Sequence, residues 1–324
     1  MNTELHPNAI GESLQRNRLS RRQALWLFGA STTVAGVGSL QGCAKSPVTG
    51  ERILVGMSEA QERQVDAQQS PHQFSQDMGA VQDGALNNYV SGLGQRIHTG
   101  TQRPTMPYSY RVLNANYVNA YTFPGGAMGV TRGIMSELQN EAELAALLGH
   151  EMGHVNARHA AQRQGQGLLA QVAVVGIGVA TADSEWGGLA NLASQVGASA
   201  LLASYSRENE READALGQDY MVKAGYPATG MTALHQVLLK GDKEEPSMLA
   251  TMFSSHPMTS ERVANADQLA RTRYAASLAA NPQRERFMDS TANLRRIKPT
   301  IDACQKGEAA LSQKDLRGAE GQFS

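Results

Sequence analysis

Two histidines four residues apart, with a glutamate beside the first, are the residues in this sequence best suited to chemistry. The segment reads His150-Glu151-Met152-Gly153-His154. Residues four apart lie on one face of an α-helix, so both imidazoles can reach a single zinc ion. Glu151 is placed to act as a general base toward a water molecule there. This HExxH pattern predicts a catalytic zinc site. The alternative is two surface histidines on an ordinary helix.

The residues before the motif predict the helix that carries it. Asn140 is a suitable N-cap, and Glu143 stands three residues later, as in a capping box. Apolar residues then follow with the spacing of one helical face. They are Leu144, Leu147, Leu148 and Met152.

A catalytic zinc ion usually has three protein ligands and one water molecule, so the motif needs a third ligand. The candidate segment is 206–214, which contains several acids. Glu210 and Asp214 are four apart and share a helix face. Glu210 could bind zinc while Asp214 accepts the free ring N–H of a ligand histidine and fixes its tautomer. Glu208 and Glu212 are expected to project into solvent. The alternative is that the whole cluster is a solvated face.

Together these segments resemble a known family. HEMGHVNARH followed by SRENEREAD is similar to the gluzincin zinc metallopeptidases of family 48, of the HtpX, CAAX prenyl protease, BepA and LoiP type. The resemblance extends over residues 46–265 and includes several further motifs in the same order. These are Pro47-Val48-Thr49-Gly50, Ser58-Glu59-Ala60-Gln61-Glu62, Asn119-Ala120-Tyr121, Pro124-Gly125-Gly126 and His256-Pro257.

The resemblance implies a fold and a set of site residues. The fold would be α+β, mainly α: a zincin-like (gluzincin) metalloprotease domain with a small β-sheet next to the HExxH helix. The site would hold one Zn²⁺ per chain. Glu210 would be the third ligand, beside the two motif histidines, and Asp214 would be the carboxylate that pairs with His150.

Two further histidines are candidates for supporting roles. His256 lies six residues before Arg262 and matches a pattern in BepA-like relatives. It is predicted to be a regulatory or fourth zinc ligand that can switch, or a transition-state donor; a structural turn at the X-Pro bond is the alternative. His159 lies five residues after His154, off the ligand face, and is expected to support the site or to be structural.

The residues between the helices predict a small sheet ahead of the zinc helix. Residues 108–113 alternate and are rich in aromatic and β-branched side chains. Two shorter strands, 119–123 and 127–131, flank the turn Pro124-Gly125-Gly126. Metallopeptidases of this kind take an extended substrate on an edge strand. We expect that edge to be formed by Ala127, Met128, Gly129 and Val130, with an ordinary core strand as the alternative.

Residues 1–42 predict export and lipid anchoring. Arg21-Arg22 precede an apolar stretch that ends in Leu40-Gln41-Gly42-Cys43. This pattern resembles a twin-arginine signal with a lipobox, in which Cys43 becomes the lipidated N-terminus. We therefore predict a signal peptide over 1–42, a tether over 43–57, and a periplasmic location with the lipid in the inner leaflet of the outer membrane. The alternative is a short membrane-anchor helix with an incidental cysteine.

Net charge and the remaining segments limit the partners and domains that we expect. The formal net charge is −1, so no nucleic-acid partner is expected. We predict a metalloprotease domain over 58–280 and a helical extension over 281–324 that loosely resembles one tetratricopeptide-like hairpin. The apolar stretch 168–181 is predicted as a buried helix covering the active site, with contact to a bilayer as the alternative.

These observations predict a zinc-dependent endopeptidase of the cell envelope. The resemblance and the predicted location imply misfolded or misassembled envelope proteins as substrates, and the outer-membrane assembly machinery as a candidate partner. The alternative is a chaperone-like assembly factor for outer-membrane proteins with latent or minor proteolysis. A purely structural zinc site is disfavoured, because such sites usually close with four ligands and are often rich in cysteine.

Overall fold

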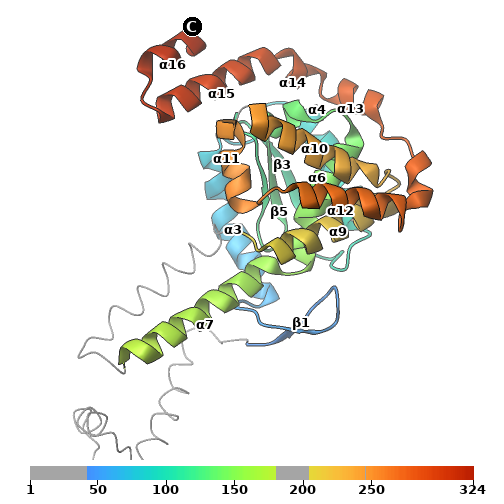
Figure 1. The fold of residues 1–324 in the computed structure, drawn as a ribbon, viewed down its shortest axis with the longest axis vertical. Coiled ribbons are helices and arrows are strands. Elements are labelled where there is room, and N and C mark those ends of the chain that lie inside the picture. Colours follow the sequence, from blue (N-terminus) through green and yellow to red (C-terminus); the bar gives the residue numbers. More distant parts are fainter. Residues whose placement is uncertain (1–41, 180–203, 245) are drawn as a thin grey trace, which may run out of the picture. The chain divides into compact units, whose positions relative to one another are not determined.

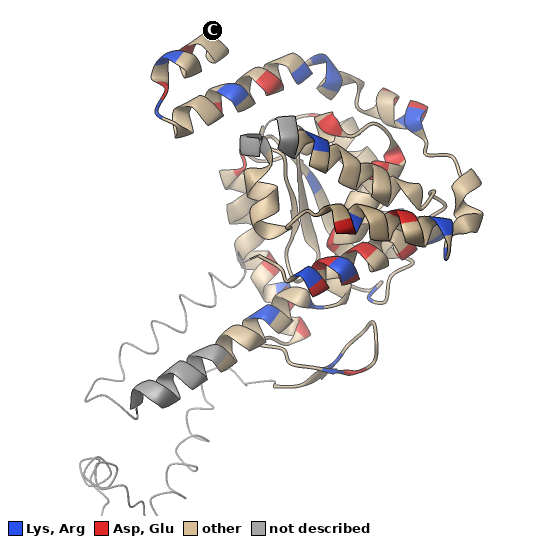
Figure 2. Ribbon diagram, viewed as in Figure 1, with Lys and Arg blue, Asp and Glu red and all other residues tan. Residues whose placement is uncertain are grey.

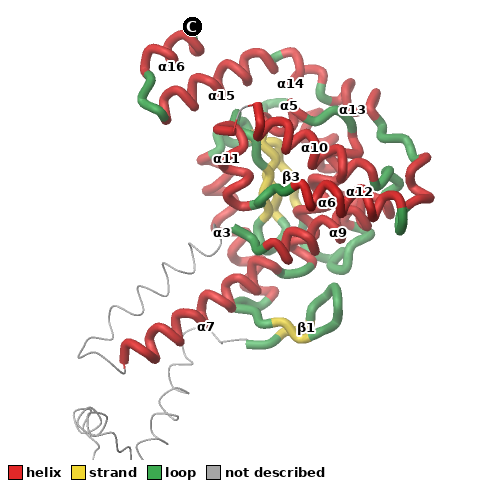
Figure 3. The backbone as a smooth tube through the Cα atoms, in the orientation of Figure 1, coloured by secondary structure: helices red, strands yellow, loops and turns green. Residues whose placement is uncertain are grey.

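The computed structural model describes residues 42–179, 204–244 and 246–324. Helices surround a small three-stranded sheet (Figures 1 and 3). The predicted class, α+β and mainly α with a sheet beside the HExxH helix, is confirmed. The predicted signal peptide lies outside the described residues, apart from Gly42. Within the described ranges, no helix combines the length and apolar character needed to span a bilayer.

Side-chain caps begin the first two helices. α3 (Glu59–Gln76) opens with a capping box between Ser58 and Gln61. α4 (Gly84–His98) is capped by Asp83, whose side chain accepts a backbone N–H of the first turn. Its apolar face packs on the sheet and lies within the main core.

The sheet has three strands, and its order corrects one prediction. β3 (Ser109–Leu113) pairs in parallel with β5 (Ala127–Thr131), and β4 (Ala120–Thr122) pairs antiparallel with the other side of β5. The expectation that Ala127, Met128, Gly129 and Val130 form the substrate-binding edge is therefore wrong. β5 is hydrogen-bonded on both sides and has no free edge. The outer strands are β3 and β4, and β4 contacts the HExxH helix.

Both faces of β5 are covered. Met128 and Val130 point into the core that α4 and the HExxH helix share. Gly129 points the opposite way, where a Cβ would stand 2.6 Å from Leu113 Cδ1 and 3.2 Å from a ring carbon of Phe74 in α3. Since neither face is free, β5 is a core strand, and its glycine permits α3 to approach the sheet closely.

Two packed helices carry the motifs. α6 (Glu141–Asn156) holds the HExxH residues and is buried along its whole length. Asn140 caps it and accepts the N–H of Glu143, as predicted. α9 (Arg207–Lys223) holds the acidic segment, is capped by Ser206, and packs along α6. Apart from α7, the other helices of the described ranges are α5 (Arg132–Glu137), α10 (Thr229–Glu244), α11 (Pro246–Ser255), α12 (Ser260–Arg271), a 3-10 helix (Ala275–Ala279), α13 (Arg284–Ser290), α14 (Ala292–Arg296), α15 (Lys298–Ser312) and α16 (Leu316–Phe323).

The predicted tether and the predicted covering helix meet each other. β1 (Ala44–Lys45) and β2 (Arg52–Ile53) form a hairpin, and Val55 and Met57 beyond it are buried against Ala161. Segment 43–57 is thus folded, and its end is docked on α7 (His159–Val179). α7 extends away from the sheet in Figure 1, and its Leu169 is 56% exposed. The side chains from residue 170 onward in the predicted covering helix lie outside the part that the structure describes.

Charged residues near the motif helices pair across the surface. Figure 2 shows acidic and basic residues interspersed along α9 and α12. Arg211 of α9 pairs with Glu208 of the same helix and with Glu261 of α12. Each of these exposed pairs contributes little to stability, typically below about 1 kcal/mol. They place Glu208 on the solvated side of α9, as predicted.

Candidate metal centre

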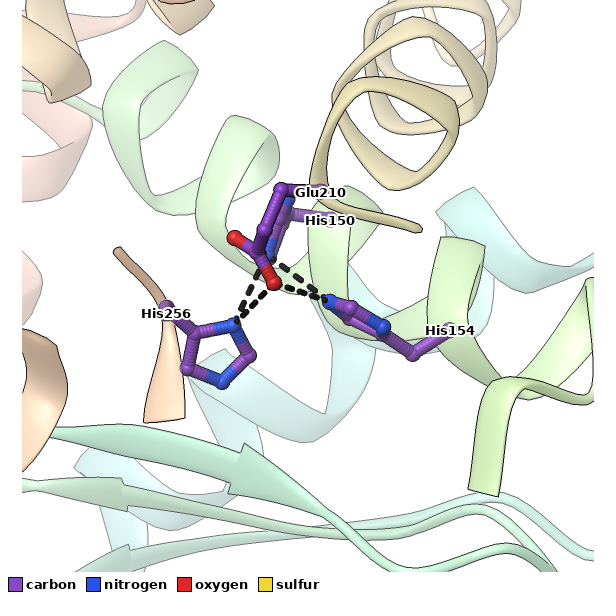
Figure 4. A group of neighbouring side chains, drawn as sticks. All are labelled: His150, His154, Glu210 and His256. Atoms are coloured by element: carbon purple, nitrogen blue, oxygen red, sulfur yellow. Dashed lines mark hydrogen bonds and ion pairs between the residues drawn. The ribbon is translucent and has the colours of Figure 1, made fainter. Parts of the chain in front are cut away.

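Four side chains from α6, α9 and the loop after α11 converge on one buried point (Figure 4). Nε2 of His154 lies 3.1 Å from Nε2 of His150 and 3.4 Å from Oε1 of Glu210. Nδ1 of His256 lies 3.3 Å from Nε2 of His150 and 3.1 Å from the same Glu210 oxygen. All candidate ligand atoms lie within 4.8 Å of one another. The structure thus assembles the three predicted ligands and His256 into a group able to hold a metal ion.

Asp214 orients His150, and Arg262 orients Asp214. Nδ1 of His150 lies 2.9 Å from Asp214, so its N–H donates there and leaves Nε2 for the centre. Arg262 makes two bonds of 2.7 Å to Asp214 and a third contact of 2.7 Å to Glu210. His235 lies 3.2 Å from Asp214. Burial alone would raise the pKa of Asp214, but His235 and Arg262 hold that pKa well below its usual range.

The sequence did not predict these two supporting residues. Arg262 entered only as part of the His256 pattern, and its contacts with both carboxylates depend on how α12 crosses α9. His235 carried no recognisable spacing to any motif. The spacing of Arg262 from His256 was its only signal in the sequence.

Glu151 is buried beside the group without joining it. Its side chain is about 1% exposed, and neither carboxylate oxygen has a hydrogen-bond partner among the described residues. The nearest imidazole nitrogen of His256 is 3.8 Å from Oε1. Burial raises the pKa of the Glu151 carboxyl, with His256 and His150 opposing. An unpartnered carboxylate with a raised pKa suits a group that takes and returns a proton.

The ionisation states of Glu210 and His154 suit metal binding. Burial would raise the pKa of Glu210, but His256, His154 and His150 hold it far below its usual range. Burial also lowers the pKa of His154 well below its ordinary value. A charged carboxylate and a neutral imidazole are the forms that bind metal ions.

His154 is held by a set of residues that the sequence identified only in part. His159 is fully buried, and its Nδ1 lies 2.9 Å from Nδ1 of His154. Its other nitrogen lies 3.1 Å from Glu212. The expectation that Glu212 projects into solvent is therefore wrong, since it is half-buried and paired. Tyr205 stacks on His154 with ring centroids 3.9 Å apart, and the guanidinium of Arg163 lies 4.1 Å from the Tyr205 ring.

The sequence is similar to several metallopeptidases. The beta-barrel assembly-enhancing protease of Yersinia pestis is 29% identical over 194 residues, covering 57% of this chain and 39% of that protein. Metalloprotease YcaL of Escherichia coli K12 is 31% identical, covering 55% and 65% of the two chains. The mitochondrial metalloendopeptidase OMA1 of Schizosaccharomyces pombe is 27% identical, covering 78% and 74%. The chain spans only about two fifths of the beta-barrel assembly-enhancing proteases.

The family assignment rests on the segment that contains the whole candidate centre. The sequence model of Peptidase family M48 matches residues 84–270, which are more than half of the chain. This range includes α6 with its two histidines, α9 with Glu210, and the loop with His256. With the motif, the sheet and the buried cluster in their expected places, the chain belongs to peptidase family M48.

Proposed function

We propose that this protein is a zinc-dependent endopeptidase in which His150, His154 and Glu210 hold one zinc ion and Glu151 is the general base. The observation that carries the proposal is the buried convergence of these groups from α6 and α9. Membership of peptidase family M48 supports a peptidase over the chaperone-like alternative.

The donor set fits zinc in type and in spacing. Zinc prefers histidine nitrogen and carboxylate oxygen in tetrahedral sites with bonds of about 2.0–2.1 Å, which places neighbouring ligand atoms roughly 3.3 Å apart. Four of the six donor pairs here are separated by 3.1, 3.4, 3.3 and 3.1 Å, and all six lie within 4.8 Å. Nitrogen atoms with unshared electron pairs that face one another at such distances repel unless a proton or a cation lies between them. A metal ion would satisfy the whole group.

In peptide hydrolysis, a bound zinc ion and the side chain of Glu151 would supply different parts of the chemistry. A zinc ion, when bound, supplies a Lewis acid that polarises a carbonyl group and lowers the pKa of a water molecule. Glu151 takes the proton of the attacking water and delivers it to the leaving amine. Its burial and its lack of a competing hydrogen-bond partner among the described residues leave both carboxylate oxygens available for this transfer.

His256 makes the proposed resting site a closed one. If His256 bound the ion together with the other three residues, the site would have four protein donors, as closed structural zinc sites do, and would leave no position for the attacking water. Activity then requires His256 to move away, so the enzyme is latent until a substrate or partner opens the site. His256 sits in a loop between α11 and α12, and its backbone N–H donates to the carbonyl of Met252, one turn earlier.

An extended substrate is proposed to pair with β4. This strand is an outer one and contacts α6. The residue before it, Asn119, has a buried side-chain oxygen without a hydrogen-bond partner among the described residues. An added strand along β4 would run beside the helix that carries the candidate general base.

The cellular setting is also proposed. Cys43 is exposed and free, which is compatible with lipidation after removal of a signal peptide. We place the protein in the periplasm, anchored by lipid to the inner leaflet of the outer membrane. One relative is named a beta-barrel assembly-enhancing protease. This name supports misassembled envelope proteins as substrates and the outer-membrane assembly machinery as a partner. Incorporation of radiolabelled lipid into the wild-type chain, and none into Cys43→Ala, is expected.

The peptidase assignment is tested with purified protein and casein. Cleavage should stop on addition of a chelator and return with zinc. Glu151→Gln keeps the three candidate ligands but removes the base, so it should keep zinc while losing roughly 10²–10⁴-fold in turnover. Because the resting site is proposed to be closed, the assay is run in the wild-type and His256→Ala backgrounds. Near-normal cleavage by zinc-loaded Glu151→Gln in either background contradicts the assignment. Rescue of an envelope defect by Glu151→Gln would favour the chaperone role.

A further inference from the structure

His154 makes a second set of contacts on the edge of its ring that faces away from the metal centre. Its Nδ1 meets Nδ1 of His159 at 2.9 Å, and Nε2 of His159 meets a carboxylate oxygen of Glu212 at 3.1 Å. His159 is fully buried, whereas Glu212 is half-buried. A carboxylate and two imidazoles therefore form one hydrogen-bonded row that ends at the candidate metal centre.

Only one arrangement of protons on neutral rings satisfies every bond in this row. An ionised carboxylate only accepts, so Nε2 of His159 carries the proton that Glu212 accepts. Nδ1 of His159 is then unprotonated and accepts the Nδ1–H of His154. This leaves the unshared electron pair of His154 on Nε2, the atom that faces Glu210. The opposite tautomer would put a proton on that nitrogen and prevent it from binding a metal ion.

A break between two helices brings His159 to this position. In an unbroken helix, a residue five places after His154 would point to a different face. Here α6 ends, Arg158 adopts the left-handed conformation with φ of 60°, and α7 begins at His159. Such a conformation is uncommon outside glycine and needs support from its surroundings. Arg158 receives it from Glu62 at 2.8 Å and from the carbonyl of Met57 at 2.9 Å.

We infer that His159 and Glu212 are positioning residues for metal binding, because together they fix the tautomer and the ring orientation of His154. The inference rests on the proposed function, since it takes Nε2 of His154 as a metal ligand. α9 then has two roles in the centre. It supplies Glu210 as a ligand. Two residues further along, it supplies the carboxylate of Glu212, which orients His154 of α6.

The test is zinc affinity, measured by competition with a chelator of known affinity. Glu212→Gln should weaken binding by about 10-fold, because an amide can donate as well as accept and no longer excludes the wrong tautomer. His159→Phe removes the acceptor and should weaken binding toward about 100-fold. His159→Asn keeps an oxygen acceptor near the position of Nδ1 and should recover most of the affinity. Glu208→Gln removes the same charge from an exposed position of α9 and should change nothing.

A second readout separates positioning from a plain structural role. In the metal-free protein, ¹⁵N NMR should find His154 protonated at Nδ1 in the wild type and a mixture of tautomers in Glu212→Gln. Wild-type zinc affinity and an unchanged tautomer in Glu212→Gln and His159→Phe would overturn the inference, as would an equal loss of affinity in Glu208→Gln. If the wild-type chain bound no zinc, the proposed function would fail, while the tautomer measurement would still decide the inference.

Discussion

Gly217 of α9 lies directly against the backbone of Gly149 in α6. A Cβ on Gly217 would stand 2.6 Å from the backbone nitrogen of His150 and 2.7 Å from the carbonyl carbon of Gly149. One on Gly149 would stand 2.7 Å from the carbonyl oxygen of Gly217. Backbone atoms cannot move aside as the end of a flexible side chain can. This close approach of the two helices allows His150 and His154 of α6 and Glu210 of α9 to reach one metal ion.

Gly217→Ala should therefore damage both the fold and the metal centre. Overpacking of this kind typically costs about 1–3 kcal/mol of unfolding free energy, and the separation of α6 from α9 should also weaken zinc binding. Gly92→Ala is the matched control, because a Cβ there meets only the end of Arg96 at 4.0 Å. That change should be neutral or stabilising by up to about 1 kcal/mol. Urea unfolding and zinc titration of the two variants decide this, and equal behaviour would contradict the packing argument.

The residues that the sequence identified are those whose roles follow from local spacing. The two histidines of α6 and the pair Glu210 and Asp214 each lie four apart on one helix, and helix periodicity alone places each pair on one face. The cap Asn140 is likewise local and lies where it was predicted.

What the sequence missed depends on how distant elements meet. The order of the strands decides which of them has a free edge, and no spacing within 127–131 reveals that order. The pairing of Glu212 with His159 depends on the rotation of α9 about its axis and on the left-handed Arg158 between two helices. An acid on a helix with several charges is solvated in most proteins, so composition favoured the wrong environment for it.

Glu210→Gln should weaken zinc binding by more than the roughly 10–100-fold typical of changes outside the ligand sphere, because a neutral amide replaces an anionic donor. Asp214→Asn should fall within that range, since it disturbs only the partner of His150. Glu208→Gln should retain zinc, because Glu208 is exposed and contacts Arg211 rather than the centre. Elemental analysis after dialysis gives the metal content. Equal loss in Glu210→Gln and Glu208→Gln would remove Glu210 from the ligand set.

His256→Ala should raise basal proteolysis, including self-cleavage, while the other three ligands retain most of the zinc. The reason is that Nδ1 of His256 lies 3.3 Å from His150 and 3.1 Å from Glu210, where a fourth ligand would stand. If His256 instead stabilises the transition state, the same substitution should slow turnover by about 10²–10³-fold, as for loss of one oxyanion donor. Casein cleavage at matched zinc content distinguishes these outcomes. Unchanged activity would leave His256 as a turn residue only.

Asp66 of α3 should make stability depend on pH in an unusual direction. Its side chain is buried and accepts the backbone N–H groups of Gly125 at 2.6 Å and Ala127 at 2.7 Å, which fixes the turn that leads into β5. Burial raises the pKa of this carboxyl from 3.8 to about 6, with the two backbone donors opposing. The folded state therefore binds a proton more tightly than the unfolded state does. The resulting stability is fully present below pH 3.8 and is lost as the pH rises through about 6.

The difference between the pKa values of Asp66 in the folded and unfolded states corresponds to a change in the free energy of unfolding on the order of 3 kcal/mol. Asp66→Asn cannot titrate, so the free energy of unfolding of the wild type minus that of the variant should fall by up to this amount between pH 4 and pH 7. Urea unfolding of both metal-free proteins across that range measures the difference and excludes loss of zinc as a cause. A difference that stays flat, or that rises with pH, would show that the folded carboxyl does not hold its proton more tightly than the unfolded one. In that case the two backbone donors, rather than burial, would dominate its environment.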